Sequence, residues 1–228
     1  MSGQTDIMSG ITDMNKEFLT VLKSLFFVAV AATAGAVLAI LSVRFHMPTG
    51  WVGALALIIW SIWARKNWAH IQAQTGLEPS GPERVLRLRA AGTALLVGHM
   101  LAGLSHLGLD LHIGQGNYLA IDSWTMFAAL LLAGIFFRHD EAIRDERDDS
   151  ITARGTKAGY LSLIGMLILL LSLLGFLPVH TLENLDYFTL ANILVAIILL
   201  SITIKYTMQL IGYAKDTEAA LTMGLKND

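Results

Sequence analysis

The sequence predicts an all-α membrane protein with six transmembrane helices, and three observations support this fold class. First, 54% of the 228 residues are hydrophobic and only 15% are charged, whereas a soluble domain carries about 25% charged residues. Second, apolar runs recur six times, and their lengths approach the roughly 20 residues of helix that cross a bilayer. Third, none of these runs alternates polar and apolar residues with a period of two, which favours helices over the strands of a membrane barrel.

The first predicted span follows a polar, acidic segment that lacks the basic region of a secretory signal, so we expect this span to be retained. The second is the shortest, with 17 residues. The fifth is rich in leucine, and we expect it to face lipid more than the others do. The six spans are Ser24–Val43, Pro48–Ala64, Ala90–Leu109, Tyr118–Phe137, Ala158–Leu177 and Tyr187–Ile204.

The distribution of lysine and arginine predicts the orientation of the chain. Fifteen of the 16 basic residues lie in the terminal segments or in the connections after the second and fourth spans, and only Arg44 lies in another connection. Because basic loops stay in the cytoplasm, this asymmetry predicts that both termini are cytoplasmic. We expect the protein in the inner membrane of a bacterial cell, with the lipid bilayer as its main partner.

The spans form pairs, which predicts three helical hairpins near residues 18–66, 88–138 and 157–206 within a single domain. Cytoplasmic linkers 67–87 and 139–156 separate the hairpins, and a cytoplasmic tail covers 207–228. The fourth span opens with IDSWT and the sixth with LDYFT, which indicates either duplicated hairpins or convergent helix capping by aspartate. The aromatic residues of these junctions, with Trp51 at the second span, are expected at the membrane interface.

Small residues indicate where helices pack. They lie four apart on the first span and again on the third. Lipid gives no hydrophobic drive for helix association, so helix contacts should use small residues, and we expect both of these helices to be central in the bundle. The residues are Ala31, Gly35 and Ala39 on the first span, and Ala94, Gly98 and Ala102 on the third.

Two polar residues inside the spans are candidate functional residues. His99 is the ionisable residue nearest to the middle of a span, and Asn192 lies in the sixth span. An ionisable group within a membrane is a functional hypothesis in its own right. The alternative is that both side chains only make hydrogen bonds between helices.

A second group of candidates lies towards the outer side. Imidazoles with a carboxylate suit zinc, copper or iron, and histidines from two spans can ligate a haem. The alternative is that these histidines contact lipid headgroups and water. No metal motif such as HExxH occurs, so no cofactor is predicted. The candidates are His46, His106, Asp110, His112 and His180.

Recognisable enzyme motifs are missing. The chain contains no GxSxG and no glycine-rich phosphate loop. Ser105 and His106 are neighbours on a predicted helix and point in different directions, so they cannot form a catalytic pair. The absence of cysteine excludes disulfides and thiolate sites. The basic residues are scattered and form no basic face, so the sequence does not predict nucleic-acid binding. These features favour a protein that is not an enzyme.

The most highly charged stretch of the chain is RDERDDSITARGTKAGYLSL, residues 144–163. It resembles the junction between spans in a family of small, uncharacterised bacterial membrane proteins that carry an Asp-Glu-Arg-Asp segment. The resemblance implies a multi-pass membrane protein and implies no activity. The matching positions are Asp145, Glu146, Arg147, Asp148, Ile151, Arg154 and Tyr160.

The charged segment supports two interpretations. It is either a solvated hinge between hairpins or a surface on which a cytoplasmic protein partner docks, and the docking residues would be Asp145, Glu146, Arg147 and Asp148. We therefore expect a regulatory or sensor subunit coupled to a cytoplasmic partner. The first alternative is a small transporter or channel-like bundle, and the second is a redox protein that binds metal or haem at the outer histidines. The oligomeric state does not follow from the sequence.

Overall fold

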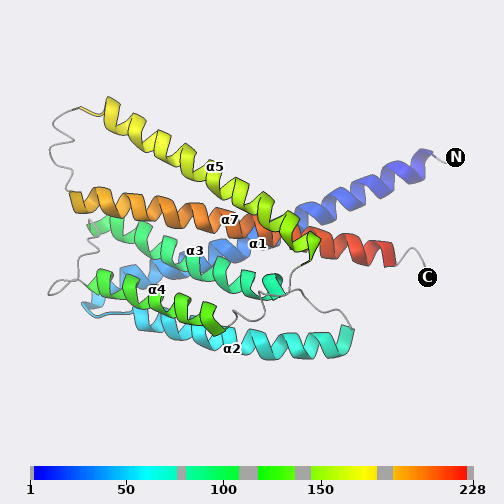
Figure 1. Cartoon of the computed structure of the whole chain (residues 1–228), viewed down its shortest axis with the longest axis horizontal. Helices are drawn as coiled ribbons and strands as arrows, with labels where there is room; N and C mark the ends of the chain where they lie inside the picture. The colour runs from blue at the N-terminus through cyan, green and yellow to red at the C-terminus, as the bar shows by residue number, and fades with distance from the viewer. Residues whose placement is uncertain (1–2, 76–80, 108–117, 137–144, 179–186, 225–228) are drawn as a thin grey trace.

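The computed structural model describes residues 3–75, 81–107, 118–136, 145–178 and 187–224. Within these ranges the chain forms six α-helices and no strand, which confirms the all-α prediction (Figure 1). The helices are α1 (Gly3–Phe45), α2 (Gly50–Thr75), α3 (Gly81–Leu107), α4 (Tyr118–Phe136), α5 (Glu146–Phe176) and α7 (Tyr187–Gly224).

Five of the six described helices are long and apolar enough to cross a membrane, as expected of a multi-pass membrane protein. The exception is α2, whose apolar stretch ends at the adjacent cations Arg65 and Lys66. Even so, α2 exposes Leu55, Ile59 and Ile62, which lie on one helical face. The prediction of six spans is therefore supported for five helices, and the span in α2 stays a prediction.

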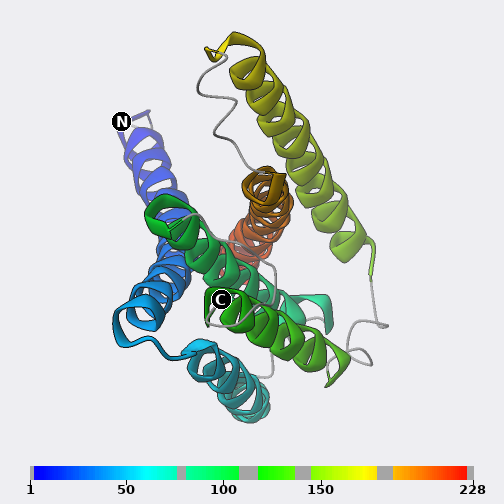
Figure 2. The same cartoon turned by 90° about the vertical axis from the view of Figure 1, so that its left-hand side faces the viewer.

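Helix α3 occupies the centre of the bundle. It contacts α1, α7, α4 and α2, and 78% of the residues in its most apolar stretch are buried, against 6% in α5. Figure 2 shows α3 between α1 and α4, with α5 at the periphery. The second half of α5 diverges from its neighbour α7 (Figure 1), and Gly165 and Gly175 face open space. The exposure of α5 agrees with the predicted lipid-facing position, and its contact with lipid stays a prediction.

Small residues form helix contacts, as predicted, and those of α1 and α3 meet one another. The central position expected of both spans holds for α3, whereas only 17% of the apolar stretch of α1 is buried. A Cβ atom added at Gly35 would collide with the carbonyl oxygen of Leu95, and one added at Gly98 would collide with that of Ala32. The backbones of α1 and α3 therefore touch, as small residues permit in a membrane.

The three connected helix pairs do not pack alike. The third pair, α5 and α7, packs as a hairpin along the first half of α5, where Gly155 and Gly159 contact α7. In contrast, α1 packs mainly against α3, and α2 packs mainly against α4. The first two hairpins are thus interleaved, because the small residues of α1 match those of α3 rather than any on α2.

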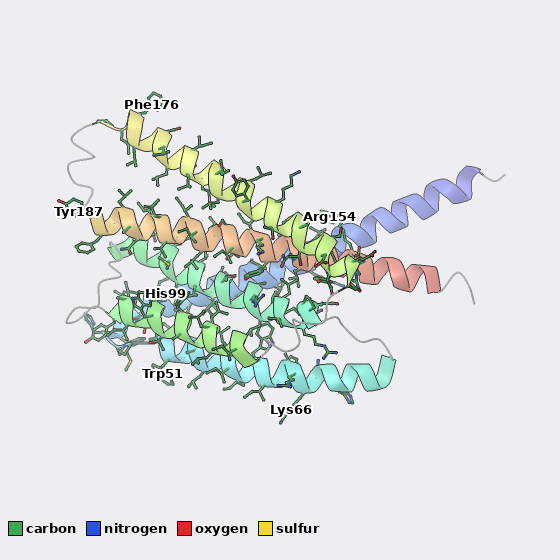
Figure 3. The ribbon with its side chains drawn as sticks, in the orientation of Figure 1. Trp51, Lys66, His99, Arg154, Phe176 and Tyr187 are labelled. Carbon is green, nitrogen blue, oxygen red and sulfur yellow. The ribbon has the colours of Figure 1, made fainter. Side chains whose placement is uncertain are left out.

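The bundle has two chemically different ends. Trp51, Phe176 and Tyr187 are exposed at one end, which we call the aromatic end, while Lys66 and Arg154 lie towards the other, the basic end (Figure 3). The first residues of α1 and the last residues of α7 extend beyond the basic end (Figure 1). The exposed aromatic residues fit the predicted interface positions, and the side of the membrane on which each end lies stays a prediction.

Candidate functional site

The first candidate site is built around the tight turn from α1 to α2. His46 adopts φ 52°, in the left-handed region, and the Ser42 hydroxyl donates to the carbonyl oxygen of Met47 over 3.2 Å. A Cβ atom at Gly50 would collide with the backbone of Asp122 on α4. Because only glycine leaves this space, α2 begins directly against α4.

Asp122 caps α2 from a different helix. Its Oδ1 accepts the backbone N–H of Gly50 over 2.6 Å, and the Thr49 hydroxyl lies 3.3 Å from its Oδ2. The carboxylate therefore meets the positive end of the α2 dipole. The capping alternative for the IDSWT junction expects Asp122 to cap the helix that it opens, and it caps α2 instead. Helix α4 begins one turn earlier, at Tyr118, so Asp122 lies inside it.

His99 on α3 completes this network. Its side chain and that of Asp122 are both fully buried, at 0% exposure. The Nδ1 atom of His99 lies 3.2 Å from the Ser123 hydroxyl, and its Nε2 atom lies 3.8 Å from Oδ2 of Asp122. That distance is too long for a hydrogen bond. Among the described side chains, Nε2 of His99 is the one buried polar atom without a hydrogen-bond partner.

The arrangement of Ser123, His99 and Asp122 contains the elements of a nucleophile, a base and an orienting acid. All three are buried, however, with Ser123 only 5% exposed. Asp122 is also committed to the start of α2. A substrate therefore cannot reach the Ser123 hydroxyl in this arrangement.

Asn192, the other predicted intramembrane residue, is buried on α7 and has an interaction partner. Helix α7 packs along α3, as expected for a polar residue between helices. Ser105 donates to the carbonyl oxygen of Ala102 on its own helix over 3.0 Å.

A second buried carboxylate, that of Asp148, lies in the first turn of α5. Asp145 caps the helix by accepting the backbone N–H of Asp148 over 2.7 Å, and Oδ2 of Asp148 accepts the N–H of Asp145 over 3.3 Å. This reciprocal pair is a capping box. The Tyr213 hydroxyl on α7 donates to Oδ1 of Asp148 over 2.6 Å. The start of α5 is therefore fastened to α7.

The four predicted docking residues have different environments. Asp148 is turned inward, whereas Asp145, Glu146 and Arg147 are exposed. The Nε atom of Arg147 donates to Asp216 over 3.1 Å, and its guanidinium lies 5.4 Å from the centre of the Tyr213 ring. Residues 146–156 belong to α5 and not to a linker, so part of the acidic charge serves to begin and anchor a helix. Docking of a partner stays a prediction.

A cavity of about 500 Å³ opens at the basic end, between α1, α2, α3 and α7. Phe27 and Trp60 pack in its wall, with ring centroids 5.7 Å apart. Sequence reasoning missed this cavity, because its wall combines four helices that lie far apart in the chain. Its aromatic residues are Phe27, Trp60, Trp63 and Tyr213, and its charged residues are Lys23, Glu83 and Arg87.

The predicted outer metal ligands are not brought together among the described residues. His46 is exposed in the α1–α2 turn. The side chain of His106 lies outside the described residues, as do Asp110, His112 and His180. In the part of the chain that the structure describes, no three histidine, aspartate or glutamate side chains form a group that could hold a metal ion. A site at these residues stays a prediction.

The resemblance of residues 144–163 to uncharacterised bacterial membrane proteins also stays a prediction, since no family model, no curated protein and no solved structure matches the chain.

Proposed function

We propose that the protein is a membrane sensor or regulatory subunit that binds an amphiphilic small molecule in the cavity at the basic end. Occupancy of the cavity is transmitted to the start of α5. One observation carries this proposal: Tyr213 lines the cavity and also donates its hydroxyl to the buried carboxylate of Asp148.

The cavity has the size and chemistry of a small-molecule site. Such sites enclose roughly 300–1,000 Å³ and combine an apolar, aromatic wall with a few polar groups. Here the aromatic wall adjoins two cations, Lys23 and Arg87, and one acid, Glu83. Glu83 and Arg87 lie four apart on α3 in the favourable order. The excess of positive charge favours an amphiphile with an apolar body and an anionic group.

Tyr213 supplies the route from the cavity to α5. A ligand that displaces its hydroxyl removes a hydrogen bond from Asp148, whose burial makes the loss of a partner costly. Asp148 also forms the capping box, so loss of this hydrogen bond changes the position of the first turn of α5. The second half of α5 has few neighbours within the chain and leaves the helix free to tilt.

In this proposal the basic end faces the cytoplasm of a bacterial cell. The exposed side chains of Asp145, Glu146 and Arg147 then present α5 to a protein partner. Displacement of Tyr213 alters the position of these side chains, and the partner detects the change.

Tryptophan fluorescence tests whether the cavity binds a ligand. Protein in phosphatidylcholine nanodiscs is titrated with a panel of brominated aromatic and alkyl carboxylates and sulfonates, because bromine quenches nearby indole rings. We expect at least one probe to quench saturably. The double variant Trp60→Phe, Trp63→Phe should lose this quenching, whereas the matched control Trp51→Phe, Trp124→Phe at the aromatic end should keep it. The absence of saturable quenching with every probe would refute the cavity as a binding site.

Distance measurements between spin labels test the transmission. The chain contains no cysteine, so labels at Asp149→Cys on α5 and Lys215→Cys on α7 are specific. We expect the quenching probe to broaden or lengthen the distance distribution, and Tyr213→Phe to do so without any probe. A distribution that is identical in all three samples would show that binding is not coupled to α5.

The transporter alternative requires a water-accessible path near His99 and Asn192, and both side chains are buried. A solvent-accessibility scan of α3 and α7 with cysteine reagents discriminates the two functions. Protection throughout both helices supports the sensor, whereas labelling beside His99 supports transport. Stoichiometric metal in the purified protein would instead favour the redox alternative.

A further inference from the structure

The unpartnered Nε2 atom of His99 is the feature of the bundle that its packing does not explain. A buried polar atom without a hydrogen bond destabilises a fold, and the other buried polar side-chain atoms that the structure describes have partners. The nearest group of opposite character is the carboxylate of Asp122, with Oδ2 at 3.8 Å. This network lies at least 12 residues of α3 away from the cavity residue Arg87, which corresponds to about 18 Å along the helix.

A neutral imidazole at His99 cannot interact favourably with both the Ser123 hydroxyl and the Asp122 carboxylate. It has one N–H donor and one acceptor nitrogen. If Nδ1 donates to Ser123, the lone pair of Nε2 faces a carboxylate oxygen, and the two repel. If Nε2 carries the proton instead, it points at an acceptor 3.8 Å away, beyond hydrogen-bonding distance.

A protonated imidazole satisfies every group. Both nitrogens then donate, Nδ1 to the Ser123 hydroxyl and Nε2 towards Oδ2 of Asp122. Opposite charges attract strongly in a site that excludes water. The gap of 3.8 Å is small enough to close by a modest shift of α3 against α4.

We propose that His99 and Asp122 form an intramembrane proton-binding site. Uptake of one proton from water forms an N–H bond on the imidazole, gives the site one additional positive charge, and leaves the carboxylate ionised. The resulting ion pair draws α3 towards α4.

Protonation of His99 also affects the turn between α1 and α2. Oδ2 of Asp122, which His99 approaches, also lies 3.3 Å from the Thr49 hydroxyl. That hydroxyl has a second acceptor, the carbonyl oxygen of Leu38, at 2.8 Å. Protonation of His99 therefore shifts Thr49 from Asp122 towards Leu38. Gly50 keeps its hydrogen bond to Oδ1, so the start of α2 stays capped.

Few other charges act on this site. The described part of α1 between residues 28 and 43 has no ionisable side chain, and the exposed Arg44 and His46 follow it. The ionisable residues of α4 are Tyr118 and Asp122. On α7 the ionisable residue nearest to the aromatic end is Tyr187, and the first ionisable residue of α2 is Arg65. Among these described residues, Asp122 is the charged group nearest to His99.

Nitrogen NMR of the imidazole tests this proposal directly. The six other histidines are replaced by glutamine, and the protein is labelled with ¹⁵N-histidine and titrated in nanodiscs from about pH 4 to pH 9, the range in which histidine titrates. We expect one titration, that of His99. Asp122→Asn keeps an acceptor for Gly50 but removes the charge, and it should lower the proton affinity more than tenfold.

Two further variants keep the test independent of folding defects. Thr49→Val frees Oδ2 of Asp122 and should raise the proton affinity of His99, the opposite direction to Asp122→Asn. Ser105→Ala, an exposed serine on the same helix, should leave the titration unchanged. The proposal is overturned if His99 keeps one protonation state throughout, or if its titration is identical in the parent, Asp122→Asn and Thr49→Val proteins.

Discussion

The two ends of the bundle each bury an aspartate that receives a hydrogen bond from a distant helix, and the two networks differ in completeness. Asp148 accepts from Tyr213 and from the backbone of Asp145, so both of its oxygens have donors. Asp122 also has donors for both oxygens, yet Nε2 of His99 faces it without a bond. A complete network fixes a helix in place, whereas an incomplete network leaves a group that a proton can satisfy.

The largest expected effect comes from removing the complete network. Asp148→Ala deletes the reciprocal cap of α5 and leaves the buried Tyr213 hydroxyl without an acceptor. Loss of a cap costs about 1 kcal/mol and an unsatisfied buried group about 1–3 kcal/mol. We expect the free energy of unfolding, measured by denaturant titration in mixed micelles, to fall by about 2–4 kcal/mol. The exposed neighbour Asp149→Ala is the control, and an equal loss there would show that Asp148 has no special role.

Separating α1 from α3 should disturb the His99 end alone. Gly98→Ala places a Cβ atom against the carbonyl oxygen of Ala32. Overpacking of this kind costs about 1–3 kcal/mol, and the residue adjoins His99. We expect a lower thermal midpoint with unchanged probe quenching at the cavity. Gly165→Ala, which faces open space on α5, should leave the midpoint unchanged. Loss of quenching in Gly98→Ala would mean that the two ends are not independent.

Removing a single hydroxyl at the basic end should have a moderate effect. Tyr213→Phe keeps the ring beside Arg147 and deletes the donor to Asp148. A buried carboxylate that loses one hydrogen bond costs about 1–3 kcal/mol, so we expect an unfolding free energy lower by about 2 kcal/mol. Tyr160→Phe, on the exposed face of α5, is the matched control. Indistinguishable stabilities of the two variants would contradict the proposed anchor.

The smallest effect is expected at the incomplete network. Ser123→Ala removes the hydroxyl beside Nδ1 of His99, and a neutral hydrogen bond contributes only about 1 kcal/mol. Because His99 already lacks one partner, we expect the cost to depend on pH and to be larger where His99 is protonated. Thermal midpoints of this variant and of Ser105→Ala, recorded at acidic and alkaline pH, measure the difference. A cost independent of pH would argue against protonation of His99.

Features that depend on local sequence were predicted correctly. The apolar runs predicted where the helices lie, because burial in lipid requires a continuous apolar stretch whose backbone bonds are internal. Gly35 and Gly98 were recognised as helix-contact residues, since small side chains are what allow two backbones to touch, whereas the structure shows that they join α1 to α3. The leucine-rich fifth span corresponds to the least buried of the five apolar helices. Each of these inferences needs only the residues of one or two segments.

The candidate sites needed the tertiary structure. The motif around Asp122 indicated a helix cap but not that the cap belongs to α2, 72 residues away from Gly50. The acidic residues around Asp148 could be recognised in the sequence as a charged stretch. Its hydrogen-bond donor, Tyr213, could not be recognised, because it lies 65 residues further along the chain. No spacing in the sequence relates such partners, because the order in which helices pack decides them.

The sequence by itself determined the fold class, the positions of the helices and the small residues through which helices pack, because hydrophobicity and residue size act locally. Only the tertiary structure decided that one buried aspartate is fully satisfied, that the other faces His99 across 3.8 Å, and that four helices enclose a cavity. These properties arise where polar groups from distant segments meet in a water-free interior, where each missing hydrogen bond has an energetic consequence.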